Sequence, residues 1–452
     1  MWLAYQIVLT LLLVCAAPIW LLRRGGHDLA LLRGRLGAGE APPPRASGDA
    51  GDAGDAGPLW IHAVSVGEVN VARTLLEDLP DDLPLLLTTV TPTGQRLARE
   101  LAQRRAALRV AYLPFDLAPP LRRFLRRERP RALILMESEY WPLLQRMLRR
   151  RGVPIYVVNA RVSDRTWRRQ RRVLRWAPAL LRPLFGPVTR FCTQTEVDAE
   201  RLAALGAPRE RIVVTGNLKF EQARPRESPE ASRLLEQVAG GRPVVVAGST
   251  MPGEDEVLLR ALAELAARRR DVLLVLAPRH PERWDSVAEA VRRAGFPLVR
   301  RSSGDAAAPA SPPRQHGAEP RRGGSVLLLD TIGELAALYR HADVAYVGGT
   351  LSATGGHNPL EPALYGRPLL VGPSMENFRR IAEQFEEHRA WRQVQDGDEL
   401  CRVLGEWIDD PAAAAQYGER ARALLAAGQG ARRRTFAAIP ELLEAAGRSR
   451  AT

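Results

Sequence analysis

The chain has 452 residues, of which 46% are hydrophobic and 26% are charged. This is the composition of an ordinary globular protein and its length fits two or three domains, so a disordered, collagen-like or single small-domain protein is excluded. Its 65 Lys and Arg against 51 Asp and Glu give a net charge of +14, which predicts an anionic partner without distinguishing nucleic acid, acidic lipid and phosphorylated small molecules.

The N-terminus predicts a membrane anchor. Residues Leu3–Leu22 contain no charged side chain, and at 1.5 Å per residue they match the roughly 30 Å hydrocarbon core of a bilayer. Arginines follow this stretch and none precedes it, so the positive-inside rule keeps the bulk of the chain cytoplasmic. A cleaved signal peptide is the alternative, but the stretch lacks the basic segment that normally begins one. We therefore expect an uncleaved single-pass anchor over residues 1–24.

Two low-complexity segments lack apolar periodicity. Ala41–Gly57 is rich in proline and then repeats Gly-Asp-Ala, so we expect residues 25–57 to be a connector. Arg301–Gly324 is expected to be a surface loop inside a domain. Neither segment has the residue pattern of a functional site.

Between these segments, short apolar runs alternate with helical patterns in two separate series. Because no polar residues interrupt the runs, they predict parallel strands that helices cover on both faces. The expected strands are Leu59–Val64, Leu85–Val90, Ala132–Met136 and Ile155–Asn159, then Pro243–Ala247, Val272–Ala277, Val326–Leu329, Val344–Val347 and Pro368–Val371. We expect an α/β fold with two doubly wound, Rossmann-like domains over residues 58–220 and 221–440, and a tail over 441–452. Ligands of such domains bind beyond the carboxyl ends of the strands, here in a cleft between the domains.

The first candidate site residue follows the first strand. In the segment His62–Glu68 (HAVSVGE), Gly67 permits a tight turn and Glu68 stands at the start of the next helix. A carboxylate there can act as a general base for a hydroxyl group. The commoner role of an acid in a first helical turn is to complement the helix dipole, and on these residues alone that alternative is favoured.

Further polar residues follow a later strand of the first domain. Glu137 and Glu139 come directly after the apolar run Ala132–Met136, where solvated acids are uncommon. They could bind a cation, a sugar hydroxyl or a neighbouring arginine. The arginine-rich stretch from Arg165 to Arg175 suits a surface on anionic lipid headgroups, or equally a solvated helix face.

The chain contains a single lysine, Lys219, among its 65 basic residues. An ammonium and a guanidinium are not interchangeable where geometry is tight, although composition alone equally allows chance survival. From the interdomain segment Gly216–Phe220, this ammonium could neutralise charge on a reacting group. The three cysteines, Cys15, Cys192 and Cys401, are far apart, so neither a disulfide framework nor a cysteine zinc site is expected.

The second domain has the residue pattern of a nucleotide-binding domain. Arg279 ends a predicted strand, where a guanidinium can contact a phosphate through two hydrogen bonds. The glycine-rich segments Gly348–Thr350 and Gly355–Glu361 could bring backbone N–H groups close to an anion, while Asn358 and Glu361 fix a base or ribose. The chain lacks a P-loop and a G-x-G-x-x-G turn, which counts against ATPases and dehydrogenases. It also lacks a D-x-D motif at a strand end, so we expect no metal-bound diphosphate.

Seven motifs occur together and in chain order: HAVSVGE, ESEYWP, NARVS, TGNLKF, GST-PGE, PRHPER and GGHNPLEP. Through them, nearly the whole chain resembles the 3-deoxy-D-manno-octulosonic acid (Kdo) transferases, membrane-bound enzymes that add Kdo to lipid A precursor. The resemblance implies a GT-B fold, a CMP-Kdo donor, inversion at the transferred sugar carbon, and neither a metal nor another cofactor. Tyr140 departs from the family, which often has leucine there.

The resemblance also implies roles for individual residues. It makes Glu68 the proton acceptor that activates the lipid A hydroxyl, which reverses the preference for a dipole role. It assigns Glu137 and Lys219 to stabilisation of the transition state. The contacts to CMP would be Pro278, Arg279, Ile332, Gly333, Glu334, Asn358, Pro359, Leu360 and Glu361. The implied partners are CMP-Kdo, the lipid A precursor and the inner membrane of a Gram-negative cell, with the catalytic domains on the cytoplasmic side and no nucleic acid.

Two alternatives stay open from the residues themselves. Another GT-B enzyme that uses a UDP-sugar, either a transferase or an epimerase, would share the fold. A membrane-tethered nucleic-acid-binding protein would share the charge, but the sequence has no helix-turn-helix, zinc or RNP-like pattern.

Overall fold

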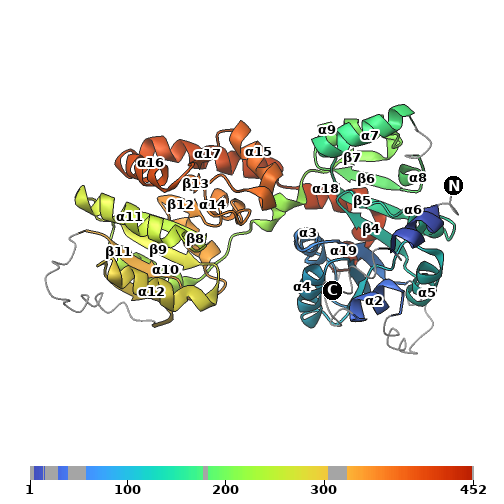
Figure 1. The fold of residues 1–452 in the computed structure, drawn as a ribbon, viewed down its shortest axis with the longest axis horizontal. Coiled ribbons are helices and arrows are strands. Elements are labelled where there is room, and N and C mark those ends of the chain that lie inside the picture. Colours follow the sequence, from blue (N-terminus) through green and yellow to red (C-terminus); the bar gives the residue numbers. More distant parts are fainter. Residues whose placement is uncertain are drawn as a thin grey trace. The chain divides into compact units, whose positions relative to one another are not determined.

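The structure, a computed structural model, describes residues 5–13, 15, 29–38, 57–176, 182–303 and 323–449. The chain divides into two compact units, a first unit of Met1–Gln222 with Gln429–Thr452 and a second unit of Ala223–Gly428. Each unit is built on a sheet of seven parallel strands that helices cover, as Figure 1 shows. The expected α/β fold with two parallel sheets is therefore confirmed.

The first unit has the strand order β3-β2-β1-β4-β5-β6-β7. Its strands are β1 (Leu59–His62), β2 (Leu85–Thr89), β3 (Leu108–Tyr112), β4 (Ala132–Met136), β5 (Ile155–Ala160), β6 (Arg190–Thr193) and β7 (Ile212–Val214). Its helices are α2 (Leu29–Arg35), α3 (Val66–Leu76), α4 (Pro92–Gln103), α5 (Ala118–Glu128), α6 (Pro142–Arg149), α7 (Asp164–Trp176), α8 (Arg182–Phe185), α9 (Glu196–Ala204), α18 (Ala431–Ala438) and α19 (Pro440–Ser449), with short 3-10 helices η3 (Arg209–Arg211) and η4 (Leu218–Gln222).

Strand β4 shows why the apolar runs become central strands. Ala132, Ile134 and Met136 pack into the core on one face of the sheet. Leu133 and Leu135 pack into the core on the other face. Because both faces are buried, the strand needs no polar alternation. Helices α3, α4, α18 and α19 cover the first face, and α5, α6 and α9 cover the second.

The C-terminal helices belong to the first unit. Ala431, Phe436 and Ile439 are buried in the same core as the strand residues of β1 and β4. The expected second domain, residues 221–440, therefore runs past the second unit, which ends at Gly428. Most of the expected tail is α19, whose Leu442 is buried in that core too. Local periodicity predicts such helices but does not indicate which of two sheets they cover.

The expected membrane anchor falls largely outside the described residues. Residues 5–13 are helical, and Tyr5 Oη donates a hydrogen bond to Asp116 Oδ2 at 2.8 Å. Gln6 Oε1 accepts one from Ala118 N at 3.2 Å. Within the part of the chain that the structure describes, no helix is both long and apolar enough to span a bilayer.

The expected connector is partly helical. Within it, α2 lies beside β3, and its last carbonyl, on Arg35, accepts a hydrogen bond from Phe115 N at 2.8 Å. The connector prediction was therefore wrong for residues 29–35. Within the expected connector, residues 39–56, which hold the proline-rich stretch and nearly all of the Gly-Asp-Ala repeat, lie outside the described residues, as do residues 304–322 of the expected surface loop.

The second unit has the strand order β10-β11-β9-β8-β12-β13-β14. Its strands are β8 (Val244–Thr250), β9 (Leu273–Pro278), β10 (Leu298–Arg300), β11 (Ser325–Leu328), β12 (Val344–Val347), β13 (Leu369–Val371) and β14 (Arg392–Gln393). Its helices are α10 (Pro229–Ala239), α11 (Glu254–Ala267), α12 (Trp284–Arg293), α13 (Leu335–Leu338), α14 (Leu360–Leu364), α15 (Arg379–Glu387), α16 (Gly397–Asp409) and α17 (Pro411–Gly428), with 3-10 helices η5 (Pro281–Arg283), η6 (Arg301–Ser303), η7 (Tyr339–His341) and η8 (Glu376–Phe378).

Strand β8 is central in this sheet and again has two buried faces. Val245 and Ala247 pack into the core that α11, α12 and α16 share. Val244 and Val246 pack into the opposite core with α10. The chain segments that leave the carboxyl ends of β8, β9, β11 and β12 consequently emerge at one edge of the sheet, where ligands of parallel sheets bind.

Candidate active site

In the first unit, the candidate residues follow strands whose carboxyl ends share one edge of the sheet. Glu68 comes after β1, in the first turn of α3. Glu137 comes directly after β4, and Lys219 lies in η4, which follows the edge strand β7. The structure brings Glu137 and Lys219 into contact, and it places Glu68 close enough to be influenced by the charge of Glu137.

Glu68 is 8% exposed and is held by the turn that precedes its helix. Its Oε2 accepts a hydrogen bond from Val64 N at 2.8 Å, and Oε1 accepts one from Ser65 Oγ at 3.3 Å. Burial raises the pKa of Glu68 to about 8; the bond from Val64 opposes the rise, and the charges of Glu137 and Glu139 add to it. A carboxylate whose pKa lies near neutral pH is suited to accept a proton. Glu68 also lies in the first turn of α3, where only the ionised form of its carboxyl group would complement the helix dipole.

Glu137 is held by its backbone and by two cations. Its φ of 57° lies in the left-handed region, which residues other than glycine adopt uncommonly. Its backbone N donates to Val158 O at 2.8 Å. Lys219 Nζ lies 3.6 Å from Oε1, and Arg161 Nε lies 3.3 Å from Oε2. Sequence reasoning proposed an arginine partner for this acid without naming Arg161, which stands in the NARVS motif.

Asn159, at the end of β5, positions the segment that carries Lys219. Its side chain is fully buried, and Oδ1 accepts a hydrogen bond from Leu218 N at 3.0 Å. Asn217 Oδ1 accepts one from Lys219 N, also at 3.0 Å. These bonds hold the backbone of η4 in place, so the Lys219 side chain starts from a fixed position beside Glu137.

The C-terminal helix α18 supports the same segment from the other side. Arg434 Nε donates to Thr215 O at 2.8 Å, and Arg432 N donates to Glu221 Oε1 at 3.3 Å. An added Cβ at Gly216 would come within 2.8 Å of the Arg434 guanidinium, and the φ of Gly216 is +94°. Sequence reasoning missed this support because α18 lies more than 200 residues after β7 and no local pattern links them.

His62, the first residue of the HAVSVGE motif, is a neutral core histidine. Its Nδ1 lies 2.9 Å from Thr88 Oγ1. Burial lowers the pKa of His62 to about 3, so the ring carries no charge near neutral pH. Its edge packs against Trp141, with ring centroids 5.9 Å apart.

In the second unit, Arg279 follows β9 and its side chain is exposed. Among the described residues, no carboxylate lies within ion-pair distance of its guanidinium. Burial, together with the charge of Arg279, lowers the pKa of His357 to about 4, so the His357 ring is neutral near neutral pH. Arg279 is therefore a cation that a ligand phosphate can reach.

The glycine-rich loop after β12 does surround an anion, but that anion is the carboxylate of Glu254. Glu254 Oε2 accepts from Gly349 N at 2.7 Å, and Oε1 accepts from Thr350 N and Leu351 N, both at 3.0 Å. Tyr346 Oη donates to the same carboxylate at 2.8 Å, and Glu254 is 2% exposed. The expectation that these N–H groups approach a ligand anion was therefore wrong, because the first residue of α11 already occupies them.

Of the residues that follow β11, Glu334 is held by hydrogen bonds, whereas Ile332 and Gly333 are open to solvent. Glu334 Oε1 accepts from Ser228 Oγ at 2.7 Å and from Arg301 Nη2 at 3.0 Å. In contrast, Ile332 is 81% exposed, and Gly333 has a φ of +95° with open space where a Cβ would stand. The exposed Ile332-Gly333 backbone is available to a ligand, while Glu334 holds the turn.

Asn358 and Glu361 are joined at the start of α14. Asn358 Nδ2 donates to Glu361 Oε1 at 3.2 Å, and Asn358 Oδ1 accepts from Leu360 N at 3.1 Å. The helix begins at Leu360, with Pro359 as its N-cap. Burial raises the pKa of Glu361, and the bond from Asn358 opposes that rise. Pro278 is buried at the end of β9.

No described group of three or more His, Cys, Asp or Glu side chains is arranged to hold a metal ion.

A family model described as 3-Deoxy-D-manno-octulosonic-acid transferase (kdotransferase) matches residues 31–222. The chain is 36% identical to the 3-deoxy-D-manno-octulosonic acid transferase of Bordetella pertussis, over 96% of this chain and 99% of the relative. It is 32% identical to the Haemophilus influenzae protein of that name, over 92% and 91%. Among solved structures, it is 30% identical to the C-terminal CMP-Kdo binding domain of WaaA from Acinetobacter baumannii, over 46% of this chain and 97% of that domain, with a TM-score of 0.38.

Proposed function

The chain belongs to the family of 3-deoxy-D-manno-octulosonic acid (Kdo) transferases, and from this premise we propose how its residues carry out the reaction. It is a glycosyltransferase of lipopolysaccharide core biosynthesis that takes Kdo from CMP-Kdo. The acceptor in this proposal is the lipid A precursor lipid IVA, the configuration of the transferred carbon inverts, and the enzyme is of the GT-B type. Family membership favours this activity over the UDP-sugar alternative.

The observation that carries the mechanism is the buried carboxylate of Glu68, whose pKa is raised to about 8. In the proposed step Glu68 takes the proton of an acceptor hydroxyl. The hydroxyl oxygen attacks the anomeric carbon of Kdo, the bond from that carbon to the CMP oxygen breaks, and CMP leaves with the bonding electrons. A single displacement of this kind inverts the configuration.

Glu137 and Lys219 are proposed to stabilise the transition state together. Lys219 supplies the positive charge, and Glu137 holds it at 3.6 Å while sharing its second oxygen with Arg161. Because Asn159 and Asn217 fix the backbone of η4, the ammonium needs little reorganisation when charge develops. An arginine at this position would extend beyond the point that the ammonium occupies.

The second unit is proposed to bind CMP. Arg279 contacts the phosphate, where charge increases as the bond to Kdo breaks. The exposed backbone of Ile332 and Gly333 contacts the nucleotide, and Asn358 and Glu361 hold the ribose or base. The remaining expected contacts are Pro278, Glu334, Pro359 and Leu360. In this scheme the N–H groups bound to Glu254 shape the site but do not touch the phosphate.

The enzyme is proposed to work at the cytoplasmic side of the inner membrane. The uncharged stretch Leu3–Leu22 supports an anchor, and its described helix leaves Ile7, Val8, Leu11 and Leu12 at least half exposed. The outer side of α7 supports the same placement, because its arginines Arg165, Arg168, Arg169, Arg171 and Arg172 are exposed.

The test is transfer by the purified full chain, supplied with CMP-Kdo and lipid IVA, with the products weighed by mass spectrometry. Each transfer should add the mass of one Kdo residue. Glu68→Gln should abolish the product while CMP still raises the melting temperature as in the wild type. Glu100→Gln, an exposed acid on α4, is the matched control and should transfer normally. Normal turnover by Glu68→Gln would overturn the assignment of Glu68 as the base. A melting temperature raised by UDP but not by CMP would overturn the assignment of CMP-Kdo as the donor.

A further inference from the structure

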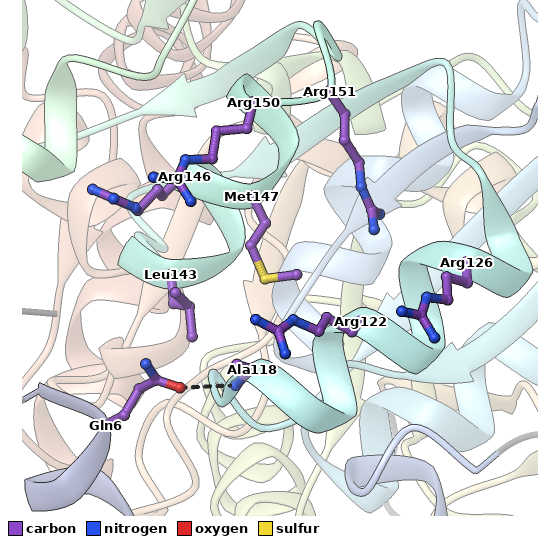
Figure 2. A pocket seen from close by; sticks show the side chains of 9 residues that line it. All are labelled: Gln6, Ala118, Arg122, Arg126, Leu143, Arg146, Met147, Arg150 and Arg151. Carbon is purple, nitrogen blue, oxygen red and sulfur yellow. Dashed lines mark hydrogen bonds between the residues drawn. The ribbon is translucent and has the colours of Figure 1, made fainter. Parts of the chain in front are cut away.

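A strongly basic pocket lies on the surface of the first unit, between α5 and α6. It has a volume of about 380 Å³, and none of the candidate catalytic residues lines it. Figure 2 shows five guanidinium groups around it, and we call it the basic pocket. These arginines are Arg122 and Arg126 from α5, and Arg146, Arg150 and Arg151 from α6 and the residues that end it.

The arginines of the basic pocket repel one another. Arg122 and Arg126 are four residues apart on α5, and Arg146 and Arg150 have the same spacing at the end of α6. Like charges at this spacing destabilise a helix. Partial burial lowers the pKa of Arg151, and the charge of Arg126 lowers it further. The fold therefore carries an electrostatic cost that a bound anion would relieve.

Four of the five arginines have no acidic partner among the described residues. Across the residues that the structure describes, no carboxylate lies within ion-pair distance of Arg122, Arg126, Arg150 or Arg151. Other arginines of the same unit are paired: Arg109 Nη2, for example, lies 2.7 Å from Glu128 Oε2. A bound anion would supply the negative charge that these four arginines lack within the described part of the chain.

The apolar N-terminal helix is fixed at the rim of the basic pocket. Gln6 lines the pocket and accepts a hydrogen bond from Ala118 N, which Figure 2 shows as a dashed line. The buried carboxylate of Asp116, just before α5, connects the N-terminal helix to α6. It accepts a hydrogen bond from Tyr5 Oη at 2.8 Å. It also accepts hydrogen bonds from Leu143 N and Leu144 N, in the first turn of α6, at 2.9 and 2.8 Å.

After Gln6, most side chains of this helix are apolar and exposed. The exposed fractions of Ile7, Val8, Leu11 and Leu12 lie between 50% and 61%. Apolar side chains next to a cluster of arginines match a molecule that carries an anionic head and an apolar tail. A soluble phosphate compound would use the arginines but not this helix.

We propose that the basic pocket binds the phosphate group of an anionic phospholipid, whose acyl chains lie along the apolar side chains of residues 7–12. Guanidinium groups bind phosphate oxygens through paired hydrogen bonds, and basic pockets beside membrane helices hold lipid headgroups in the same way. The pocket volume leaves room for the glycerol part of the headgroup beside the phosphate. Bound lipid would hold the α5–α6 face of the first unit against the membrane.

The test is native mass spectrometry of the full chain in detergent micelles, titrated with phosphatidylglycerol or phosphatidylcholine. Neither CMP-Kdo nor lipid IVA is present, so the outcome is independent of the proposed transfer reaction. We expect phosphatidylglycerol to bind at least about tenfold more tightly than phosphatidylcholine. The double variant Arg122→Gln/Arg126→Gln should weaken phosphatidylglycerol binding by roughly thirtyfold, since each basic residue near an anionic headgroup contributes about fivefold.

The matched control is Arg96→Gln/Arg99→Gln. It removes the same charge from exposed positions of α4 that have no ion-pair partner within the described ranges, on a helix that covers the opposite face of the sheet. The control should bind phosphatidylglycerol within twofold of the wild type, and Arg151→Gln should weaken binding independently of α5. Equal binding of the two lipids, or equal losses in both double variants, would show only general attraction and overturn the proposal. Inorganic phosphate that binds as tightly as phosphatidylglycerol would instead make this a site for a soluble phosphate compound.

Discussion

Lys219 Nζ lies 3.6 Å from Glu137 Oε1, so the only lysine of the chain pairs with the acid that ends β4. Both side chains are mostly but not completely buried, with 21% and 14% of their surface exposed. The pair is therefore partly shielded from water while a ligand can still reach it. Arg161 contacts the other oxygen of the same carboxylate, so the three side chains together carry a net positive charge.

Replacement of either partner should reduce the rate more than it reduces substrate binding. Lys219→Ala and Glu137→Gln are each expected to lower kcat by about 10²–10³-fold, because the first removes a positioned charge and the second releases it. Lys219→Arg should restore only part of the rate, since a guanidinium does not occupy the place of the ammonium. Steady-state kinetics with CMP-Kdo and lipid IVA measure these effects.

Glu139→Gln is the matched control for Glu137→Gln. Glu139 lies two residues further on, and within the described ranges it has no ion-pair partner. It should keep kcat within about threefold of the wild type, because an acid without a bound cation is not needed to position Lys219. Equal losses in the two variants would contradict the assigned role of the Lys219–Glu137 pair.

The pH dependence of the reaction should report the pKa of Glu68. Because the base must be deprotonated and its pKa is about 8, kcat/KM should rise about tenfold per pH unit below that pH and level off above it. Glu68→Asp should keep some activity with a shifted midpoint. A profile that is flat from pH 6 to 9 would mean that Glu68 is not the group that accepts the proton.

The free energy of unfolding should decrease with pH over the range in which kcat/KM increases. The pKa of Glu68 is about 8 in the folded state and 4.5 without its surroundings, so between these values the folded chain binds more protons than the unfolded chain. The contribution of Glu68 to the free energy of unfolding therefore decreases as pH rises through this window. Glu68→Gln should remove that decrease, and thermal unfolding of both proteins at pH 5 and pH 8.5 measures it. A wild-type pH slope that survives the substitution would contradict the raised pKa.

Glu254 should be needed for the stability of the second unit. Glu254→Gln places an amide among N–H donors from the loop, so at least one of them loses its acceptor. We expect a loss of about 3 kcal/mol in the free energy of unfolding, as for buried hydrogen bonds to a charged group. Glu256→Gln, on the exposed side of the same helical turn, should have little effect on thermal unfolding. If the two variants melted alike, the carboxylate would not organise the loop.

Arg279 should contribute to CMP binding without contributing to stability. Arg279→Gln is expected to raise the Kd for CMP by about ten- to a hundredfold, the effect of losing charged hydrogen bonds to a phosphate. Its melting temperature without ligand should stay near that of the wild type, because the guanidinium is exposed. Arg293→Gln on α12 removes another exposed charge and should bind CMP normally, as isothermal titration can show. An unchanged Kd for Arg279→Gln would exclude it from the phosphate site.

The central strands could be predicted from the sequence, whereas the edge strands could not. Runs such as Ala132–Met136 are buried on both faces and therefore apolar throughout. The unpredicted strands are β3, β6, β7, β10 and β14, and four of these form the edges of the two sheets. Edge strands are short or partly exposed, as in Leu298–Arg300 and Arg392–Gln393, so they lack the continuous apolar signal.

By itself, the sequence determined the two parallel sheets and the positions of Glu68, Glu137 and Arg279 after their strands, because strand burial and chain order are local properties. Tertiary structure decided the rest. It placed the C-terminal helices on the first sheet, gave the glycine-rich N–H groups to Glu254, and gathered arginines from α5, from α6 and from the residues that end α6 in one pocket. These relations join residues that are far apart or on different elements, and only the packing of the folded chain determines which of them meet.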